Sequence, residues 1–151
     1  MASRKITIKV HSNRSLVESE FSSAVNSMLN ELGEAATKHA KDNCPVDTGY
    51  MKRQLKHKRQ DENSEIVGTA NVDYSVYVEL GTGIYAENGN GRKTPWRYQD
   101  KNGEWHTTRG QRPQPFIRPA IENHLNEYKK IIERGMKGKS RNQKGNANTI
   151  K

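Results

Sequence analysis

The residues able to do chemistry are few, and their spacing forms no recognisable catalytic or metal site. One cysteine and five histidines are present, the latter on five separate predicted elements: His11, His39, His57, His106 and His124. No pair of histidines has a metal-ligand spacing that a second cysteine or a carboxylate completes. His39 and Cys44 are close enough to suggest a thiol nucleophile, but a surface histidine and a packed cysteine are the favoured interpretation.

Phosphate binding and general base catalysis are also poorly supported. Residues 81–83 and 89–91 are Gly-x-Gly stretches, but neither is followed by Lys-Ser or Lys-Thr as in a phosphate loop, so both predict turns. Glu79 lies in an apolar run without the partner that a catalytic base needs. Capping a loop or pairing with Arg118 is the favoured role for Glu79. The sequence therefore predicts no catalytic residue, no metal and no cofactor.

Aromatic and basic residues gather between residues 84 and 112. Such a set can stack on single-stranded nucleic acid. The same residue types are enriched at protein–protein hot spots, and we favour this second interpretation. The predicted interface residues are Trp96, Arg97, Tyr98, Trp105, Phe116 and Arg118.

A long helix is predicted for residues 15–43, because its apolar residues recur three, four and seven positions apart. Gly33 costs about 1 kcal/mol there relative to Ala, which predicts a bend or a close crossing. Pro45 ends the helix, since the residue before a proline is pushed out of the helical region. The alternating residues 5–10 predict a half-buried strand ahead of this helix.

Shorter elements follow. The turn at residues 46–49 predicts a short helix that ends near Gln54. Residues 55–60 and 65–70 predict a β-hairpin around a polar loop. Residues 71–80 fit a strand or a helix, and we favour a short helix.

Residues 84–112 predict an insertion that carries a second hairpin. Its strands lie around Trp96 and Trp105, and Asn102-Gly103 favours a type I′ turn, in which both residues take a positive φ. A two-stranded arm is marginally stable alone, so a neighbouring subunit is expected to cover it.

Pro119 is then expected to start a last helix that runs out at Gly135. The predicted fold class is α+β, with a long N-terminal helix and a C-terminal helix packed on a small antiparallel sheet, and with a protruding β-hairpin arm. Residues 1–136 form the predicted domain and residues 137–151 a basic flexible tail.

The composition indicates that the chain associates with other subunits and that its basic tail is attracted to polyanions such as DNA. Apolar residues make up 31% of the chain, and the mean hydropathy is −1.07, so the core is small. No membrane span is expected. The polar N-terminus is unlike a signal peptide, and a lone cysteine forms no internal disulfide, so assembly in a cytoplasm is expected.

The net charge is +9, and the tail supplies five basic residues with no acid. The predicted DNA contacts are Lys137, Lys139, Arg141 and Lys144.

Four segments occur in the order found in one family: residues 44–52 (CPVDTGYMK), 67–83 (with VGT and YVELGTG), 94–105 (TPW to GEW) and 111–120 (QRPQPFIRPA). The chain resembles, over about residues 24–133, the gene-product-ten-like family of head–tail joining proteins of siphophages and prophages. Met51 stands where this family usually has leucine, and Gln54 where serine often follows.

The resemblance implies a virion subunit, assembled in the host cytoplasm, that forms a ring between the head-closure complex and the tail tube. It implies no active site. The implied partners are further copies of the chain in a ring of about six, the head-closure (stopper) protein, and the tail terminator or tail-tube protein, with genomic DNA in the lumen. The alternatives are a tail terminator, a head-closure protein, or a basic nucleic-acid-binding module.

Overall fold

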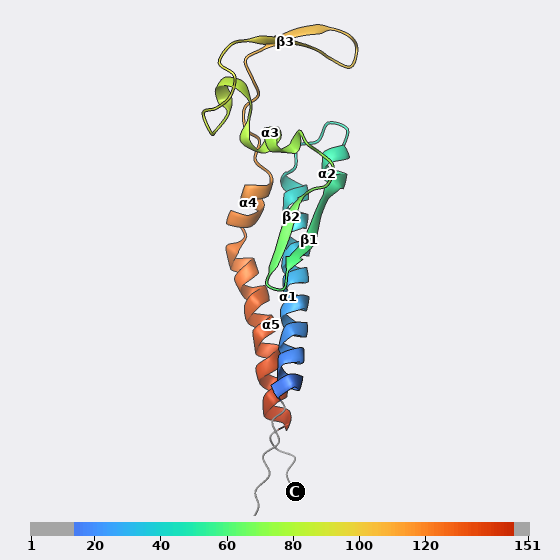
Figure 1. The fold of residues 1–151 in the computed structure, drawn as a ribbon, viewed down its shortest axis with the longest axis vertical. Helices are drawn as coiled ribbons and strands as arrows, with labels where there is room; N and C mark the ends of the chain where they lie inside the picture. The colour runs from blue at the N-terminus through green and yellow to red at the C-terminus, as the bar shows by residue number, and fades with distance from the viewer. Residues whose placement is uncertain (1–13, 147–151) are drawn as a thin grey trace, which may run out of the picture.

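The computed structural model describes residues 14–146 and the side chains of residues 18–137. The molecule is elongated, with two long helices side by side as a shaft (Figure 1). A β-hairpin lies along the first of these helices, and a second hairpin stands at the end of the molecule away from the N-terminus of the first helix. The predicted strand at residues 5–10 lies outside the described residues.

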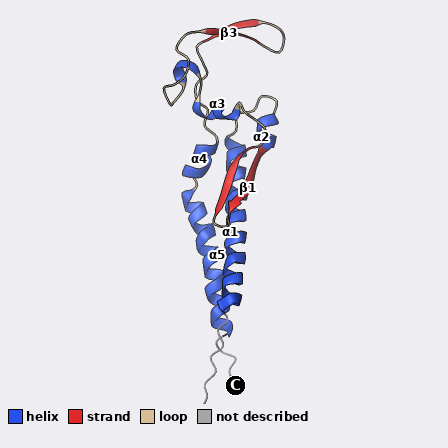
Figure 2. Ribbon diagram, in the orientation of Figure 1, coloured by secondary structure: helices blue, strands red, loops and turns tan. Residues whose placement is uncertain are grey.

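Helices and short hairpins account for all of the regular structure that is described (Figure 2). In chain order the elements are α1 (Arg14–Asn43), α2 (Tyr50–Gln54), β1 (Leu55–Asp61), β2 (Ser64–Thr69), α3 (Ser75–Leu80), the 3-10 helix η1 (Gly83–Tyr85), β3 (Trp96–Gln99), β4 (Trp105–Thr108), α4 (Ile117–Glu122) and α5 (Leu125–Asn146). This arrangement confirms the predicted α+β class, including the short helix at α3.

The β1–β2 hairpin is antiparallel, with Leu55 opposite Thr69, and it packs on α1. Gly33 makes this contact possible, because a Cβ at Gly33 would lie 2.5 Å from Nδ1 of His57. His57 Nδ1 in turn lies 2.6 Å from the Glu65 carboxylate across the hairpin. The predicted close crossing at Gly33 is therefore confirmed.

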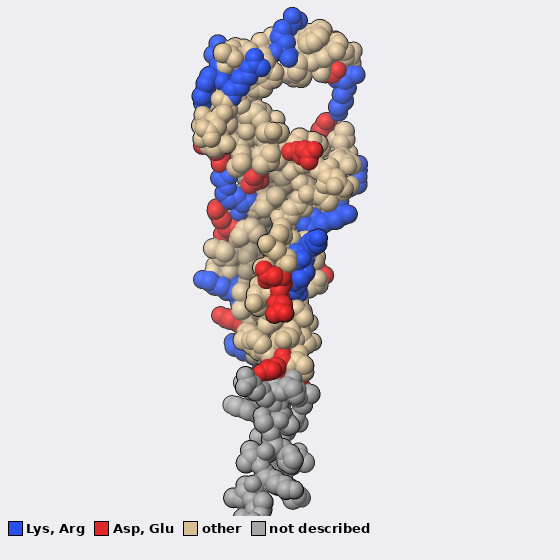
Figure 3. Space-filling model, viewed as in Figure 1, with Lys and Arg blue, Asp and Glu red and all other residues tan. Residues whose placement is uncertain are grey.

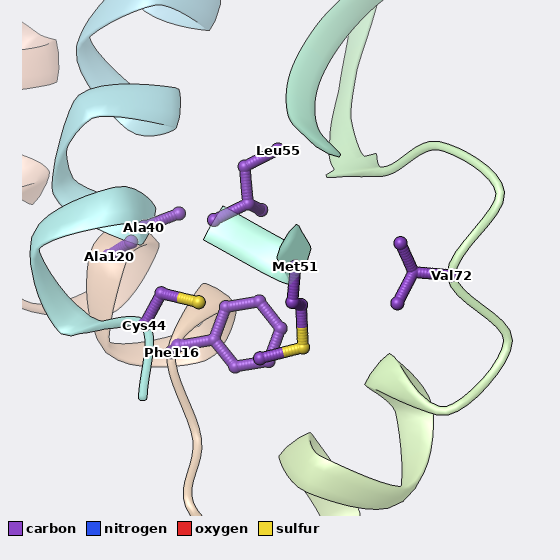
Figure 4. Packing of buried hydrophobic residues seen from close by; sticks show 7 residues of the cluster. All are labelled: Ala40, Cys44, Met51, Leu55, Val72, Phe116 and Ala120. Carbon is purple, nitrogen blue, oxygen red and sulfur yellow. The ribbon is translucent and has the colours of Figure 1, made fainter. Parts of the chain in front are cut away.

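The main core lies where α1 ends and α4 begins (Figure 4). Phe116 and Leu55 are the largest side chains that are fully buried. The cluster consists of Ala40, Cys44, Met51, Leu55, Val72, Phe116 and Ala120. One ring from the start of α4 thus packs against residues from α1, α2, β1 and the loop before α3.

A second cluster joins the two long helices. Tyr128 and Ile131 of α5 pack against Ala36 of α1, with Met28 and Val67 at its edge. The Tyr128 hydroxyl also donates a hydrogen bond to the carbonyl oxygen of Ala120, which ties α5 to α4. Apolar contact along this stripe sets the direction of the shaft.

The C-terminal helix differs from the prediction in three ways. It begins at Ile117, so Pro119 stands inside the first turn and not at the first helical position. It is interrupted at Asn123 and His124, which separate α4 from α5. It also continues past Gly135 to Asn146, and Gly135 lies beside Met28 of α1.

Substitution of Phe116 tests the main core. Phe116→Ala should lower the free energy of unfolding by about 3–5 kcal/mol, because it removes a fully buried ring and leaves a cavity. Urea unfolding followed by circular dichroism measures the change. Phe21→Ala, at a position of α1 that is 50% exposed, is the control, with an expected change within about 0.5 kcal/mol. Equal losses in the two variants would contradict this assignment of the core.

Candidate functional site

The β3–β4 hairpin, called the arm below, carries its aromatic side chains on both faces. Trp96 lies opposite Thr108, and Tyr98 lies opposite His106. Because successive side chains of a strand point to opposite faces, Trp96 and Tyr98 share one face while Arg97 and Trp105 share the other. Tyr98 is 47% and Trp105 60% exposed, so both faces present a ring to solvent.

The tip of the arm is organised by Asp100. Its carboxylate accepts hydrogen bonds from the amides of Asn102 and Glu104, and it lies 2.8 Å from Nε2 of His106. The hydrogen bond with His106, followed by that from the Glu104 amide, lowers the pKa of Asp100. Gly103 takes a φ of 85°, but Asn102 does not take a positive φ. The predicted type I′ turn is therefore wrong, because side-chain hydrogen bonds to Asp100 stabilise a longer loop.

Arginine side chains lie against the two tryptophan rings of this region. The guanidinium of Arg97 is 5.2 Å from the centre of the Trp105 ring, and that of Arg92 is 5.6 Å from the Trp96 ring. Cations over aromatic faces gain about 0.5–1 kcal/mol at exposed sites. These contacts order the rings before any partner is bound.

The base of the arm is a close crossing of two chain segments. The Thr82 amide donates to the carbonyl of Gln111, and the Ile84 amide donates to that of Arg109. Gly83, with a φ of 62°, lies at the crossing, where a Cβ would be 1.9 Å from the Arg109 carbonyl oxygen. The sequence motif Gly81-Thr82-Gly83 is thus the junction between the arm and the body.

At its tip the arm returns toward the body. Lys101 Nζ lies 3.0 Å from the Asp47 carboxylate, in an exposed ion pair. An opening remains between the arm and the body, and lysine and arginine side chains are conspicuous along the arm (Figure 3). The arm is therefore held at its base by backbone hydrogen bonds and at its tip by one surface contact.

A pocket of about 350 Å³ borders the arm's attachment. It is lined by Pro45, Val46, Asp47, Thr48, Gly49, Tyr50, Met51, Tyr74, Val78, Gln111 and Gln114. These residues come from three of the four sequence motifs, those at 44–52, 67–83 and 111–120. Motifs that are far apart in the chain thus surround one surface hollow.

Glu79 caps the start of α4. Its carboxylate accepts hydrogen bonds from the amides of Phe116 (2.7 Å), Ile117 (3.1 Å) and Arg118 (3.0 Å). A helix begins with four amides that have no partner within the helix. Three of them bond Glu79, and Pro119 has no amide hydrogen. The predicted capping role of Glu79 is confirmed.

The two remaining predicted interface residues occupy different environments. Arg118 is half-buried and pairs with Glu87 at 2.8 Å, a contact that raises the pKa of the guanidinium, so Glu79 is not its main partner. Phe116 has no exposed surface. A side chain in that position cannot contact a partner, and Phe116 is corrected from an interface residue to a core residue.

The suggested thiol nucleophile has no support in the geometry. Cys44 is buried in the main core, and desolvation raises the pKa of its thiol despite the opposing charge of Lys52. His39 instead lies 2.7 Å from Glu127 and stacks on His124. Sequence spacing gave no sign of this cluster, because His39 and Glu127 are 88 residues apart.

The predicted DNA contacts are mostly beyond the described side chains. Lys137 is exposed, while the side chains of Lys139, Arg141 and Lys144 lie outside that part of the chain. Their contact with DNA stays a prediction. Residues 137–146 of the predicted flexible tail are helical, because α5 runs to Asn146.

The described residues thus form a helical shaft that carries an aromatic arm at a motif-lined junction, and one known family matches part of the chain. Residues 11–81 match the sequence model of the HK97-gp10-like family, described as "Bacteriophage HK97-gp10, putative tail-component". Over this segment the chain is similar to that family of phage tail components, which agrees with the resemblance drawn from the motifs at 44–52 and 67–83. The match ends at Gly81, before the arm. No curated protein and no solved structure matches the chain. No helix within the described residues is long and apolar enough to cross a membrane.

Substitution of Gly83 tests the junction. Gly83→Ala should displace the arm, because the new methyl group would collide with the Arg109 carbonyl and a positive φ costs Ala about 1–2 kcal/mol. Both tryptophans of the chain lie on the arm, so acrylamide quenching of fluorescence reports its position. Gly68→Ala is the matched control, since a Cβ there would meet no atom within 4 Å. Identical quenching in both variants would show that the crossing does not hold the arm.

Proposed function

We propose that the protein is a structural subunit of the phage neck, a tail-completion or head–tail joining protein that assembles as a ring of about six copies between the head-closure complex and the tail tube. The family match supports the assignment as a phage tail component, and the arm supports the joining role. A tail terminator or a head-closure protein is the alternative within the same class. In this function the protein is not an enzyme.

One observation carries the proposal: the arm exposes ordered aromatic rings away from the core. Trp105 is 60% exposed on one face and Tyr98 47% on the other. Tryptophan, tyrosine and arginine in such positions are the residues that most often anchor protein interfaces. An arm with rings on two faces suits contact with a neighbour on each side, as a repeating ring requires.

The charge of the arm favours an acidic partner. The segment that carries the arm, residues 84–112, contains six lysines and arginines against three acids. Within it, Arg92 lies beside the Trp96 ring and Arg97 beside the Trp105 ring. Charges of opposite sign on the partner would steer the encounter and fix its register. We therefore infer that the arm docks on an acidic rim of the adjoining ring.

Binding of single-stranded nucleic acid by the arm is less well supported. A stacking platform presents successive rings on one surface. Trp105 lies on the face opposite Trp96 and Tyr98, and arginine already lies over both tryptophan rings. The arrangement favours a protein partner.

Removal of the Trp105 ring tests the joining role. Trp105→Ala should leave unfolding by urea nearly unchanged but strongly reduce head–tail joining, since loss of an aromatic anchor commonly costs about 2 kcal/mol or more of binding. Infectious particles are counted after the purified protein is added to an extract that lacks it. Thr107→Ala, on the same face of β4, is the control. Unfolding of the isolated Trp105→Ala subunit would mean that the ring serves the subunit's own stability.

Neutralisation of the tail tests the DNA contact. Replacing Lys137, Lys139, Arg141 and Lys144 together by glutamine keeps good helix formers and removes four charges. The slope of log affinity for duplex DNA against log salt should fall by about 3–4, since each phosphate contact contributes about 0.9. The same substitutions should cause DNA loss from joined particles. An unchanged salt slope together with normal DNA retention would reduce the tail to a solubilising segment.

A further inference from the structure

We propose that His39, His124 and Glu127 form a binding site for a zinc ion or a similar first-row divalent cation, which links α1 to the junction of α4 and α5. The site lies on the shaft, away from the arm, and does not depend on the neck function.

One nitrogen of His39 and one nitrogen of His124 both lie near the same carboxylate oxygen of Glu127. Oε2 of Glu127 lies 2.7 Å from Nε2 of His39 and 3.7 Å from Nδ1 of His124. The three donor atoms all lie within 4.8 Å of one another. A tetrahedral zinc site with bonds of about 2.0–2.1 Å separates its donors by roughly 3.3–3.4 Å. The two distances bracket that value, so the donors lie near the spacing of a zinc site.

Of the two histidines, His39 lies within hydrogen-bonding distance of the Glu127 carboxylate and His124 does not. His39 has one bond to Glu127, but 3.7 Å between His124 and the same oxygen is too long for a hydrogen bond. The two imidazoles stack with centres 3.4 Å apart and planes 7° apart. A neutral imidazole offers one nitrogen lone pair to a metal ion.

Charge and access also suit a cation. Glu127 supplies a carboxylate oxygen, which zinc accepts as a ligand beside imidazole nitrogen. The histidine side chains are 17% and 33% exposed and Glu127 47%, which leaves one side open for a water molecule or a partner's side chain as fourth ligand. Lys38 is a nearby opposing charge, but it is exposed and therefore screened.

Coordination requires one imidazole to turn. In the present stack the two lone pairs run side by side and do not point to one centre. His124 lies in the break between α4 and α5, where the backbone is not held in a continuous helix. The break that sequence periodicity did not predict thus places a ligand beside α1, with its side chain 33% exposed.

A second cluster in the described chain, Asp100, Glu104 and His106 at the tip of the arm, is the weaker candidate. Its Asp100 carboxylate already accepts the amides of Asn102 and Glu104 and pairs with His106. It also offers a single imidazole. This cluster supplies a matched internal control.

The test is a metal titration of the full-length, untagged protein after treatment with a chelator. Zinc sulfate measured by isothermal titration calorimetry should bind with one ion per chain and should raise the melting temperature. Magnesium should not bind, because it prefers oxygen ligands. Cobalt(II) should give visible absorption bands without a thiolate charge-transfer band, since Cys44 is buried elsewhere.

Variants separate this site from the rest of the molecule. His39→Ala and His124→Ala should each weaken zinc binding at least tenfold, and so should Glu127→Gln, whose exposed position leaves the fold intact by circular dichroism. His106→Ala should bind zinc as the unaltered protein does. Absence of saturable binding, retention of affinity in Glu127→Gln, or loss of affinity in His106→Ala would each overturn the proposal.

Discussion

The carboxylate of Glu79 is the constraint on which the rest of the structure depends. It holds the amides of Phe116, Ile117 and Arg118, and so it fixes the point at which the chain returns from the arm and becomes helical. That point places the Phe116 ring in the main core and directs α4 and α5 along α1. Hydrogen bonds to a charged acceptor contribute roughly 1.5–3 kcal/mol each, which is large against the marginal stability of a small domain.

The arm follows a different principle from the body. Its order comes from local contacts: the Asp100 loop, the arginine–tryptophan pairs and the backbone crossing at Gly83. These contacts hold the hairpin's shape without burying its rings. The main core is thus complete without the arm, and the arm leaves the rings of Tyr98 and Trp105 exposed.

Local patterns predicted the elements well, and contacts between distant segments caused the errors. The long helix, both hairpins and the short helix at α3 followed from periodicity and turn residues. The helix end predicted at Gly135 was wrong because packing on α1 continues there, and Asn102-Gly103 gave way to the Asp100 loop. Phe116 was assigned to an interface because the sequence alone does not distinguish an aromatic residue of the core from one that contacts a partner.

The sequence by itself determined the α+β class, the existence of the aromatic arm and the resemblance to a family of phage tail components, because these rest on residue types and short spacings. Only the tertiary structure decided which faces the arm's rings occupy, what Glu79 caps, and that His39 meets His124 and Glu127. The physical reason is that those contacts join residues tens of positions apart. The contacts of His39 depend on how α1 crosses the α4–α5 junction. No local pattern in the sequence gives the distance between these two segments.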